Sequence, residues 1–151
     1  MIYCYSATQK SKAYAQLLGE IINCPVYMLD CALDPTNKIS FFFSAAFRKS
    51  LSVVENMPVS IDSNEIYLVG PIWAGEVARP IKYFLENAPL SGKRVNMLLT
   101  AAICHEKYIS EAERLLAKLD CIPGEVQVFA TPKEGIDKEM SEAHIRELFN
   151  V

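Results

Sequence analysis

The stretch Glu65–Gly75 reads EIYLVGPIWAG, and it decides the fold. Its first half, Glu65–Gly70, is an apolar run with little alternation, which is typical of a strand buried on both faces of a parallel sheet. Its second half, Pro71–Gly75, carries proline and glycine, the residues that favour a turn. Beyond it, Pro80–Asn87 has an apolar face at helical spacing, with Pro80 in the first turn, where its missing N–H costs nothing. Strand, turn and helix in this order form the unit from which parallel sheets are built.

The same alternation of strand and helix runs through the rest of the chain. Further strands are predicted at Met1–Tyr5, Val26–Leu29, Val95–Leu99 and Glu125–Phe129. Further helices are predicted at Ser11–Asn23, in part of 38–56 and at 138–149, the last with Asp137 as its cap. Another helix is predicted to begin at a capping box formed by Ser110 and Glu113. No linker or repeat divides the chain, so we expect one domain over residues 1–151, an α/β sandwich with helices on both faces of a parallel sheet.

Composition limits the kind of protein this is. The net charge is −3 and the isoelectric point is about 5.4, which argues against a nucleic-acid partner. The five cysteines form no C-x-x-C pair, so we expect neither a disulfide framework nor a metal site. No apolar run approaches the roughly 18 residues of a membrane span, and no leader pattern begins the chain. We therefore expect a cytoplasmic protein that binds no membrane.

Three turns are candidates for a ligand site. In parallel sheets, ligands bind beyond the carboxyl ends of the strands, where the strand order reverses. The turns that follow the relevant strands are 6–11, 71–76 and 100–108. The first carries the hydroxyls of Ser6, Thr8 and Ser11 and the amine of Lys10 at the start of a helix, which suits a phosphate. The same hydroxyls could simply cap the helix, and this turn alone leaves both readings open.

The second turn carries a resemblance to a known family. The order Gly70-Pro71-Ile72-Trp73-Ala74-Gly75, then Arg79-Pro80-Ile81, Phe84-Leu85 and Leu90-Ser91-Gly92-Lys93, resembles flavodoxins, in particular a short group with a P-I-W turn. The first turn is similar to that family's Ser/Thr-x-Thr-Gly-x-Thr phosphate loop. Ser6, Thr8 and Ser11 stand at its three hydroxyl positions, and Gln9 stands at its glycine. The resemblance covers nearly the whole chain and is strongest over residues 1–22 and 64–100.

The resemblance implies a fold, a cofactor and a function. The fold would be flavodoxin-like, a five-stranded parallel sheet of order 2-1-3-4-5. The cofactor would be non-covalent FMN, and the protein would carry electrons to redox partner proteins or to a small-molecule acceptor, with no catalytic residue of its own. The implied FMN contacts are Ser6, Thr8, Gln9, Lys10 and Ser11 at the phosphate, Pro71, Ile72, Trp73, Ala74 and Gly75 along one side of the ring, and Thr100, Ala101 and Ala102 at its other edge.

Other functions fit the same residues. One is an FMN-dependent NAD(P)H:quinone or nitro-compound reductase, and another is a flavodoxin-like module that has lost FMN. Either a monomer or a homodimer is possible, because Phe41–Phe43 and Phe47 could form a dimer face or ordinary core.

Two cysteines suggest a thiol nucleophile instead. Cys4, five residues and then Lys10-Ser11 resemble the phosphate loop of small phosphotyrosine phosphatases, but Lys10 lacks the bidentate guanidinium of that family. The pair Cys104-His105 is the second candidate, and we expect ordinary loop residues there because adjacent side chains point apart.

Overall fold

The structure, a computed structural model, describes residues 1–31, 53–131 and 138–149. Its strands are β1 (Ile2–Cys4), β2 (Val26–Met28), β3 (Glu65–Trp73), β4 (Glu76–Val77), β5 (Arg94–Ala101) and β6 (Ile122–Ala130). Its helices are α1 (Lys10–Ile21), α3 (Arg79–Asn87), α4 (Glu106–Leu116) and α5 (Lys138–Phe149).

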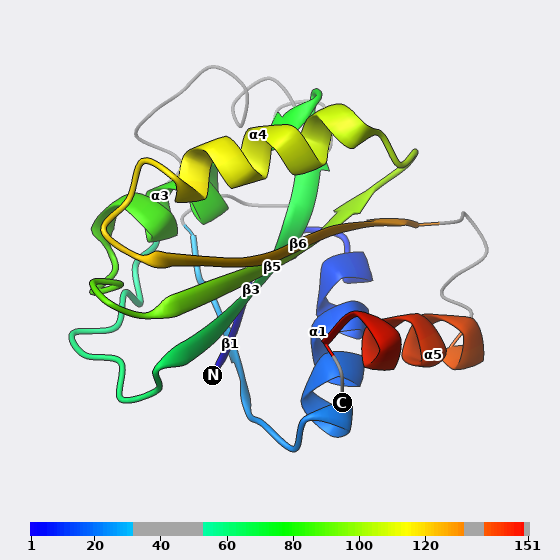
Figure 1. The fold of residues 1–151 in the computed structure, drawn as a ribbon, viewed down its shortest axis with the longest axis horizontal. Coiled ribbons are helices and arrows are strands. Elements are labelled where there is room, and N and C mark those ends of the chain that lie inside the picture. Colours follow the sequence, from blue (N-terminus) through cyan, green and yellow to red (C-terminus); the bar gives the residue numbers. More distant parts are fainter. Residues whose placement is uncertain (32–52, 132–137, 150–151) are drawn as a thin grey trace.

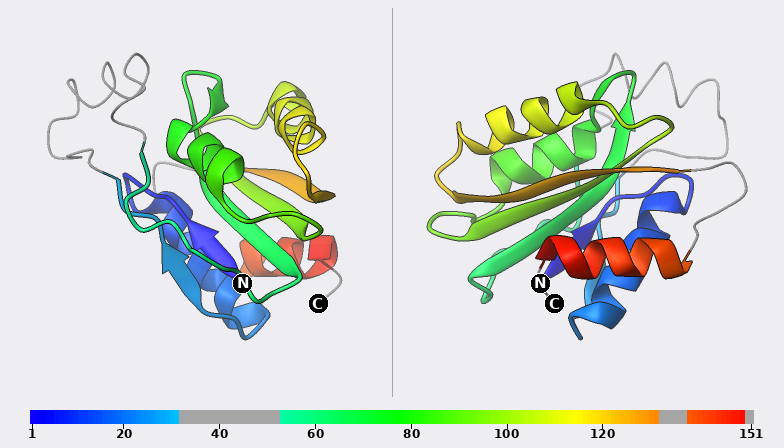
Figure 2. Two further views of the ribbon diagram at one scale, coloured as in Figure 1. Left: turned by 90° about the vertical axis from the view of Figure 1, so that its left-hand side faces the viewer. Right: turned by 45° about the vertical axis from the view of Figure 1, so that its right-hand side comes forward.

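The sheet has the predicted topology. Five strands lie in the order β2-β1-β3-β5-β6 and all of them pair in parallel, while the short β4 pairs antiparallel with the end of β3. Counted along the chain without β4, this is the order 2-1-3-4-5. Figure 1 shows α3 and α4 together over one face of the sheet and α1 and α5 together over the other, and both views of Figure 2 agree. The predicted three-layer α/β sandwich is therefore confirmed.

The central strand β3 explains why both faces need helices. Successive side chains of a strand point to opposite faces. Ile66 and Leu68 accordingly join the buried cluster beneath α3 and α4, while Tyr67 and Val69 join the cluster beneath α1 and α5. An unbroken apolar strand thus supplies core to both layers, which is what its lack of alternation indicated.

The helices present the apolar faces that the sequence spacing predicts. On α1, Tyr14, Leu17 and Leu18 are buried, and on α3, Ile81 and Phe84 are buried. Gly70 lets α3 approach the sheet closely, since a Cβ at this position would lie 2.5 Å from Ile81 Cγ1. Within the described residues, no helix is long and apolar enough to cross a bilayer.

Several predicted boundaries differ from those of the structure, as where β6 begins at Ile122 instead of Glu125 and β5 ends at Ala101 instead of Leu99. Two further differences lie beside the candidate site. Helix α4 begins at Glu106 with His105 as its N-cap, so Ser110 and Glu113 lie inside the helix and form no capping box. Strand β3 runs on to Trp73 instead of ending at Gly70, because β4 folds back and pairs with its last residues.

Of the predicted partial helix at 38–56, the structure describes only residues 53–56. Residues 53–56 are not helical, and Val54 forms an isolated antiparallel bridge with Cys31. Residues 38–52, which include Phe41–Phe43 and Phe47, lie outside the described part of the chain, as does the predicted cap Asp137.

Candidate functional site

The three candidate turns follow β1, β3 and β5, which are neighbours in the sheet. One buried hydrogen bond joins the first turn to the third, since Ser11 Oγ and Thr100 Oγ1 lie 2.8 Å apart. This bond fixes the start of α1 against the end of β5. The hydroxyls of Ser11 and Thr100 therefore serve the architecture of the site, in addition to any contact with a ligand.

The first turn leaves a buried hydroxyl without a partner. Ser6 Oγ is buried and makes no hydrogen bond to any described residue. A buried polar atom almost always has a partner, so this hydroxyl is available to a water molecule or to a bound ligand. Thr8 and Gln9, the next polar side chains along the turn, are exposed.

The start of α1 is not capped by a side chain. Its N-cap residue is Gln9, which makes no side-chain cap hydrogen bond and holds a left-handed backbone conformation with φ 64° and ψ −8°. Lys10 is the first residue of α1, and its Nζ lies 3.5 Å from the carbonyl oxygen of Thr131. The first N–H groups of a helix carry partial positive charge, so an uncapped start with a lysine beside it favours an anion.

The second turn is the tip of a β-hairpin. Strands β3 and β4 pair directly at Ile72↔Val77 and Trp73↔Glu76, which leaves a two-residue loop of Ala74 and Gly75. Both loop residues have positive φ, 49° and 86°, as a type I′ hairpin turn requires. Pro71, Ile72 and Trp73 therefore lie on a strand, and only Ala74 and Gly75 form the turn itself.

Trp73 connects the hairpin to the first strand. Its ring meets the ring of Tyr5 edge to face, with 5.4 Å between centroids and 81° between planes. Tyr5 is buried directly after β1, whereas Trp73 is only partly buried. The pair thus offers a partly exposed aromatic surface beside the first turn. The sequence predicted Tyr5 only as the last residue of a strand, and its place beside the candidate site appears only in the structure.

The third turn is short and exposed. Ala101 belongs to the end of β5, and its carbonyl oxygen accepts hydrogen bonds from the backbone N–H of Thr131 at 2.8 Å and from its hydroxyl at 3.1 Å. Ala102 follows on the surface, and the side chain of Ile103 is 74% exposed. An exposed isoleucine at this position has no signal in the sequence, because only the structure shows that it faces away from the core.

The second and third turns also approach each other. A Cβ on Gly75 would lie 3.7 Å from Lys107 Nζ, so the amine of Lys107, in the first turn of α4, lies beside the hairpin tip. Of the predicted residues, Ser11 and Thr100 bond directly, while the hairpin meets the other two turns through Tyr5 and Lys107 at the same end of the sheet.

The structure argues against a thiol nucleophile at either Cys4 or Cys104. Cys4 is fully buried within β1, and burial raises the pKa of its thiol to about 12, so it cannot act as a thiolate nucleophile. Cys104 is exposed, but its thiol donates to the carbonyl oxygen of Val128 at 3.1 Å, while the His105 ring lies against the Tyr108 ring at 5.9 Å. These contacts point the two side chains to different partners.

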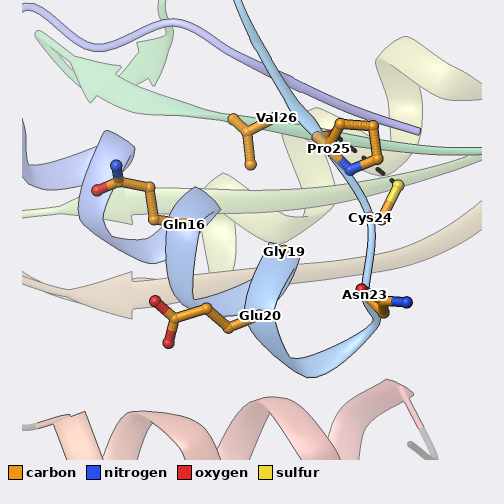
Figure 3. A pocket seen from close by; sticks show the side chains of 7 residues that line it. All are labelled: Gln16, Gly19, Glu20, Asn23, Cys24, Pro25 and Val26. Atoms are coloured by element: carbon orange, nitrogen blue, oxygen red, sulfur yellow. Dashed lines mark hydrogen bonds between the residues drawn. The ribbon is translucent and has the colours of Figure 1, made fainter.

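A separate groove lies at the other end of α1. Figure 3 shows it between the last turn of α1 and the segment leading into β2, lined by Gln16, Gly19, Glu20, Asn23, Cys24, Pro25 and Val26. It is far along the helix from Gln9, and it gathers no set of converging polar groups. Among the described residues, no cluster of three or more potential metal ligands occurs.

Several solved structures with a similar fold are flavoproteins or flavodoxins. A Bacteroides uniformis protein assigned to the flavoproteins aligns over 97% of this chain and 96% of its own, with a TM-score of 0.73 and 20% identity. A Lactobacillus acidophilus flavoprotein in complex with FMN aligns over 84% of this chain and 90% of its own, with a TM-score of 0.62 and 20% identity. A Streptococcus pneumoniae flavodoxin aligns over 99% and 96%, with a TM-score of 0.53 and 16% identity. No family model and no curated protein matches the chain. The fold is flavodoxin-like.

Proposed function

We propose that this chain is an FMN-binding protein of the flavodoxin-like fold that carries electrons. The observation that carries the proposal is the buried, unpartnered Ser6 Oγ beside the uncapped start of α1. Such an atom is accounted for if the phosphate of FMN accepts its hydrogen bond. The FMN complex of the Lactobacillus acidophilus flavoprotein, which has the same fold, supports this choice of cofactor.

The first turn would hold the phosphate. The N–H groups at the start of α1, the amine of Lys10 and the hydroxyls of Ser6 and Thr8 are all donors, which suits a dianion. Gln9 adds a carboxamide on the exposed side of the turn. Ser11 contributes in another way, because its bond to Thr100 keeps the turn seated against β5.

The hairpin and the third turn would hold the ring. Trp73 supplies a partly exposed aromatic surface, and its edge-to-face contact with Tyr5 limits the directions in which its ring can turn. Pro71, Ile72, Ala74 and Gly75 would form the rest of that wall, and Thr100, Ala101 and Ala102 would lie at the opposite edge. When bound, FMN supplies the transfer of one or two electrons, and the protein orients it and excludes water.

Absorption spectroscopy tests the proposal directly. Protein incubated with FMN and then desalted should keep the yellow flavin absorption, and a colourless protein would contradict FMN binding and leave a flavodoxin-like module without flavin. Ser6→Ala should weaken FMN binding roughly 10- to 150-fold, since a hydrogen bond to a charged group contributes about 1.5–3 kcal/mol. Ser110→Ala, which removes an exposed hydroxyl on α4, is the matched control and should not change the affinity.

The exposed Ile103 favours a second candidate, an FMN-dependent NAD(P)H:quinone or nitro-compound reductase. An apolar side chain beside the third turn suits contact with a flat apolar substrate. Oxidation of NADPH by the FMN-loaded protein that accelerates when a quinone is added would support the reductase. An absence of NADPH oxidation would favour the electron carrier.

A further inference from the structure

One ammonium group ties together the segments that follow the second and third turns. Lys82 on α3 bonds Glu76 Oε2 on β4 at 2.9 Å and Glu111 Oε1 on α4 at 3.0 Å. The same Glu111 oxygen accepts a hydrogen bond from the backbone N–H of Val77, the second residue of β4, at 3.4 Å. Three elements that are separate in the chain therefore meet at one Lys82 side chain.

This cluster is partly shielded from water. The side chain of Lys82 is 23% exposed and that of Glu111 is 21% exposed, whereas that of Glu76 is 71% exposed. Burial alone would favour the neutral amine of Lys82, but the hydrogen bonds to Glu76 and Glu111 outweigh it, and the pKa of Lys82 is raised. The Lys82–Glu111 pair is therefore screened less than a surface ion pair, whereas the Lys82–Glu76 pair has an exposed carboxylate and contributes less.

The ion cluster adds to the contacts that hold β4 in place. Among the described strands, the two-residue β4 pairs with β3 alone, while Val77 is buried and its N–H bonds Glu111. So few backbone hydrogen bonds stabilise a hairpin end weakly, and side-chain contacts such as those of Lys82 add to its stability. Glu76 lies directly opposite Trp73 in the register, so fixing Glu76 also fixes the backbone that carries the tryptophan. At the tip, Gly75 lies beside Lys107 of α4, which is a second contact between the two turns.

We infer that Lys82 is a positioning residue that sets the separation of the hairpin and the third turn, and thereby the width of the slot for the flat ring of the flavin. This inference rests on the proposed function only in naming the flavin as the ligand between the two turns; the role of Lys82 in holding the hairpin does not depend on it. Lys82 touches no part of the first turn in the contacts described, so its effect should fall on the ring and not on the phosphate. Ser6 and Lys10, in contrast, are expected to affect binding of the phosphate.

The first test reads the hairpin without any flavin. Trp73 is the single tryptophan of the chain, so its fluorescence reports on the hairpin alone. Lys82→Met keeps most of the apolar stem and removes the charge. We expect red-shifted Trp73 emission and about a twofold rise in quenching by acrylamide, because the hairpin is less closely held. Lys82→Arg should restore the wild-type spectrum, since a guanidinium can bridge both carboxylates.

Two further variants keep the test decisive. Lys118→Met removes an exposed lysine in the turn after α4 that has no ion pair among the described residues, and it should leave Trp73 emission unchanged. If Lys82→Met does not fold, Glu76→Gln removes only the exposed arm of the cluster and should shift the emission in the same direction by less. Wild-type emission in a folded Lys82→Met, or in Glu76→Gln where the lysine variant does not fold, would overturn the inference.

The second test separates ring from phosphate by comparing FMN with riboflavin, which lacks the phosphate. Lys82→Met should weaken both flavins by the same factor, roughly tenfold, in line with other indirect positioning effects. Ser6→Ala should weaken FMN alone. If Lys82→Met weakens the binding of FMN but not of riboflavin, or changes Trp73 emission without weakening the binding of either flavin, Lys82 has no role in holding the ring. If the wild type binds neither flavin, the proposed function fails, and the Trp73 measurements still decide whether Lys82 positions the hairpin.

Discussion

Gln9 holds a backbone conformation that glycine adopts more readily. Its φ of 64° is left-handed, and for a residue with a Cβ this costs about 1 kcal/mol. Gln9→Gly should therefore raise the free energy of unfolding by about 0.5–1 kcal/mol, after the greater chain entropy of glycine is subtracted. Urea unfolding of the flavin-free protein measures this difference.

Gln16 provides the control for this change within the same helix. It is exposed in the middle of α1, where the backbone is helical. Gln16→Gly should lower the free energy of unfolding by about 0.5–1 kcal/mol, because glycine is a poor helix former. Two substitutions of the same type should thus have opposite signs. A loss of stability in Gln9→Gly would show that Gln9 makes a contact that outweighs its strain.

Cys4 and Cys104 differ in the accessibility of their thiols, and their reactivity should differ accordingly. Cys4 is fully buried and its pKa is raised to about 12 by burial, so its thiolate is very scarce near neutral pH. Cys104 is exposed on the third turn. Brief treatment of the native protein with iodoacetamide should modify Cys104 and leave Cys4 intact, as peptide mass spectrometry would show. Early modification of Cys4 would mean that β1 opens locally.

At the scale of elements, the packing of α3 on β3 depends on Gly70. Alanine at this position would place its methyl 2.5 Å from Ile81 Cγ1 and 2.6 Å from Ile81 Cδ1. Such overpacking typically costs about 1–3 kcal/mol, and Gly70→Ala should lower the free energy of unfolding by that amount. Adding Ile81→Ala removes both clashing atoms, so the double variant should lose less than the sum of the two single losses. If the losses of the two single variants add up in the double variant, the clash with Ile81 is not the cause of the loss in Gly70→Ala.

The hairpin should loosen in acid. The hydrogen bond and charge of Lys82 hold the pKa of Glu76 below its ordinary value of 4.5. A carboxyl with a lowered pKa stabilises the fold above its unfolded pKa, and that contribution is lost as the pH falls through the folded pKa. The Trp73 emission should therefore change with a midpoint below 4.5, and Glu76→Gln should abolish this step. A transition retained in Glu76→Gln would assign it to another group.

The elements themselves were predictable from local patterns, whereas their ends were not. Helical periodicity identified α1 and α3, because each buries a face whose spacing is set by helix geometry, and short apolar runs identified the five parallel strands. The start of α4 at Glu106 was missed, since Ser110 and Glu113 match a capping box equally well inside a helix. The extension of β3 to Trp73 depends on pairing with β4, which no local pattern of β3 contains.

At the scale of the whole molecule, the candidate site lies where the sheet reverses its order. From β1 the chain crosses to β2 on one side and then to β3 on the other, so the first and second turns open beside each other. For this reason the sequence pattern alone predicts that the first and second turns lie at the same edge of the sheet. It could not show the contacts between them, Ser11 with Thr100 and Tyr5 with Trp73, because these join segments that are far apart in the chain.

Flavin binding should stabilise the whole fold, because the site is assembled from turns that come together only in the folded chain. A ligand that binds only the native state at 100 times its dissociation constant adds about 2.7 kcal/mol to the free energy of unfolding. Urea titrations with increasing FMN should show this rise, with riboflavin at equal concentration giving a smaller one because it lacks the phosphate contacts of Ser6 and Lys10. In Ser6→Ala the two flavins should stabilise more equally. Equal effects of FMN and riboflavin on the wild type would place the phosphate outside the first turn.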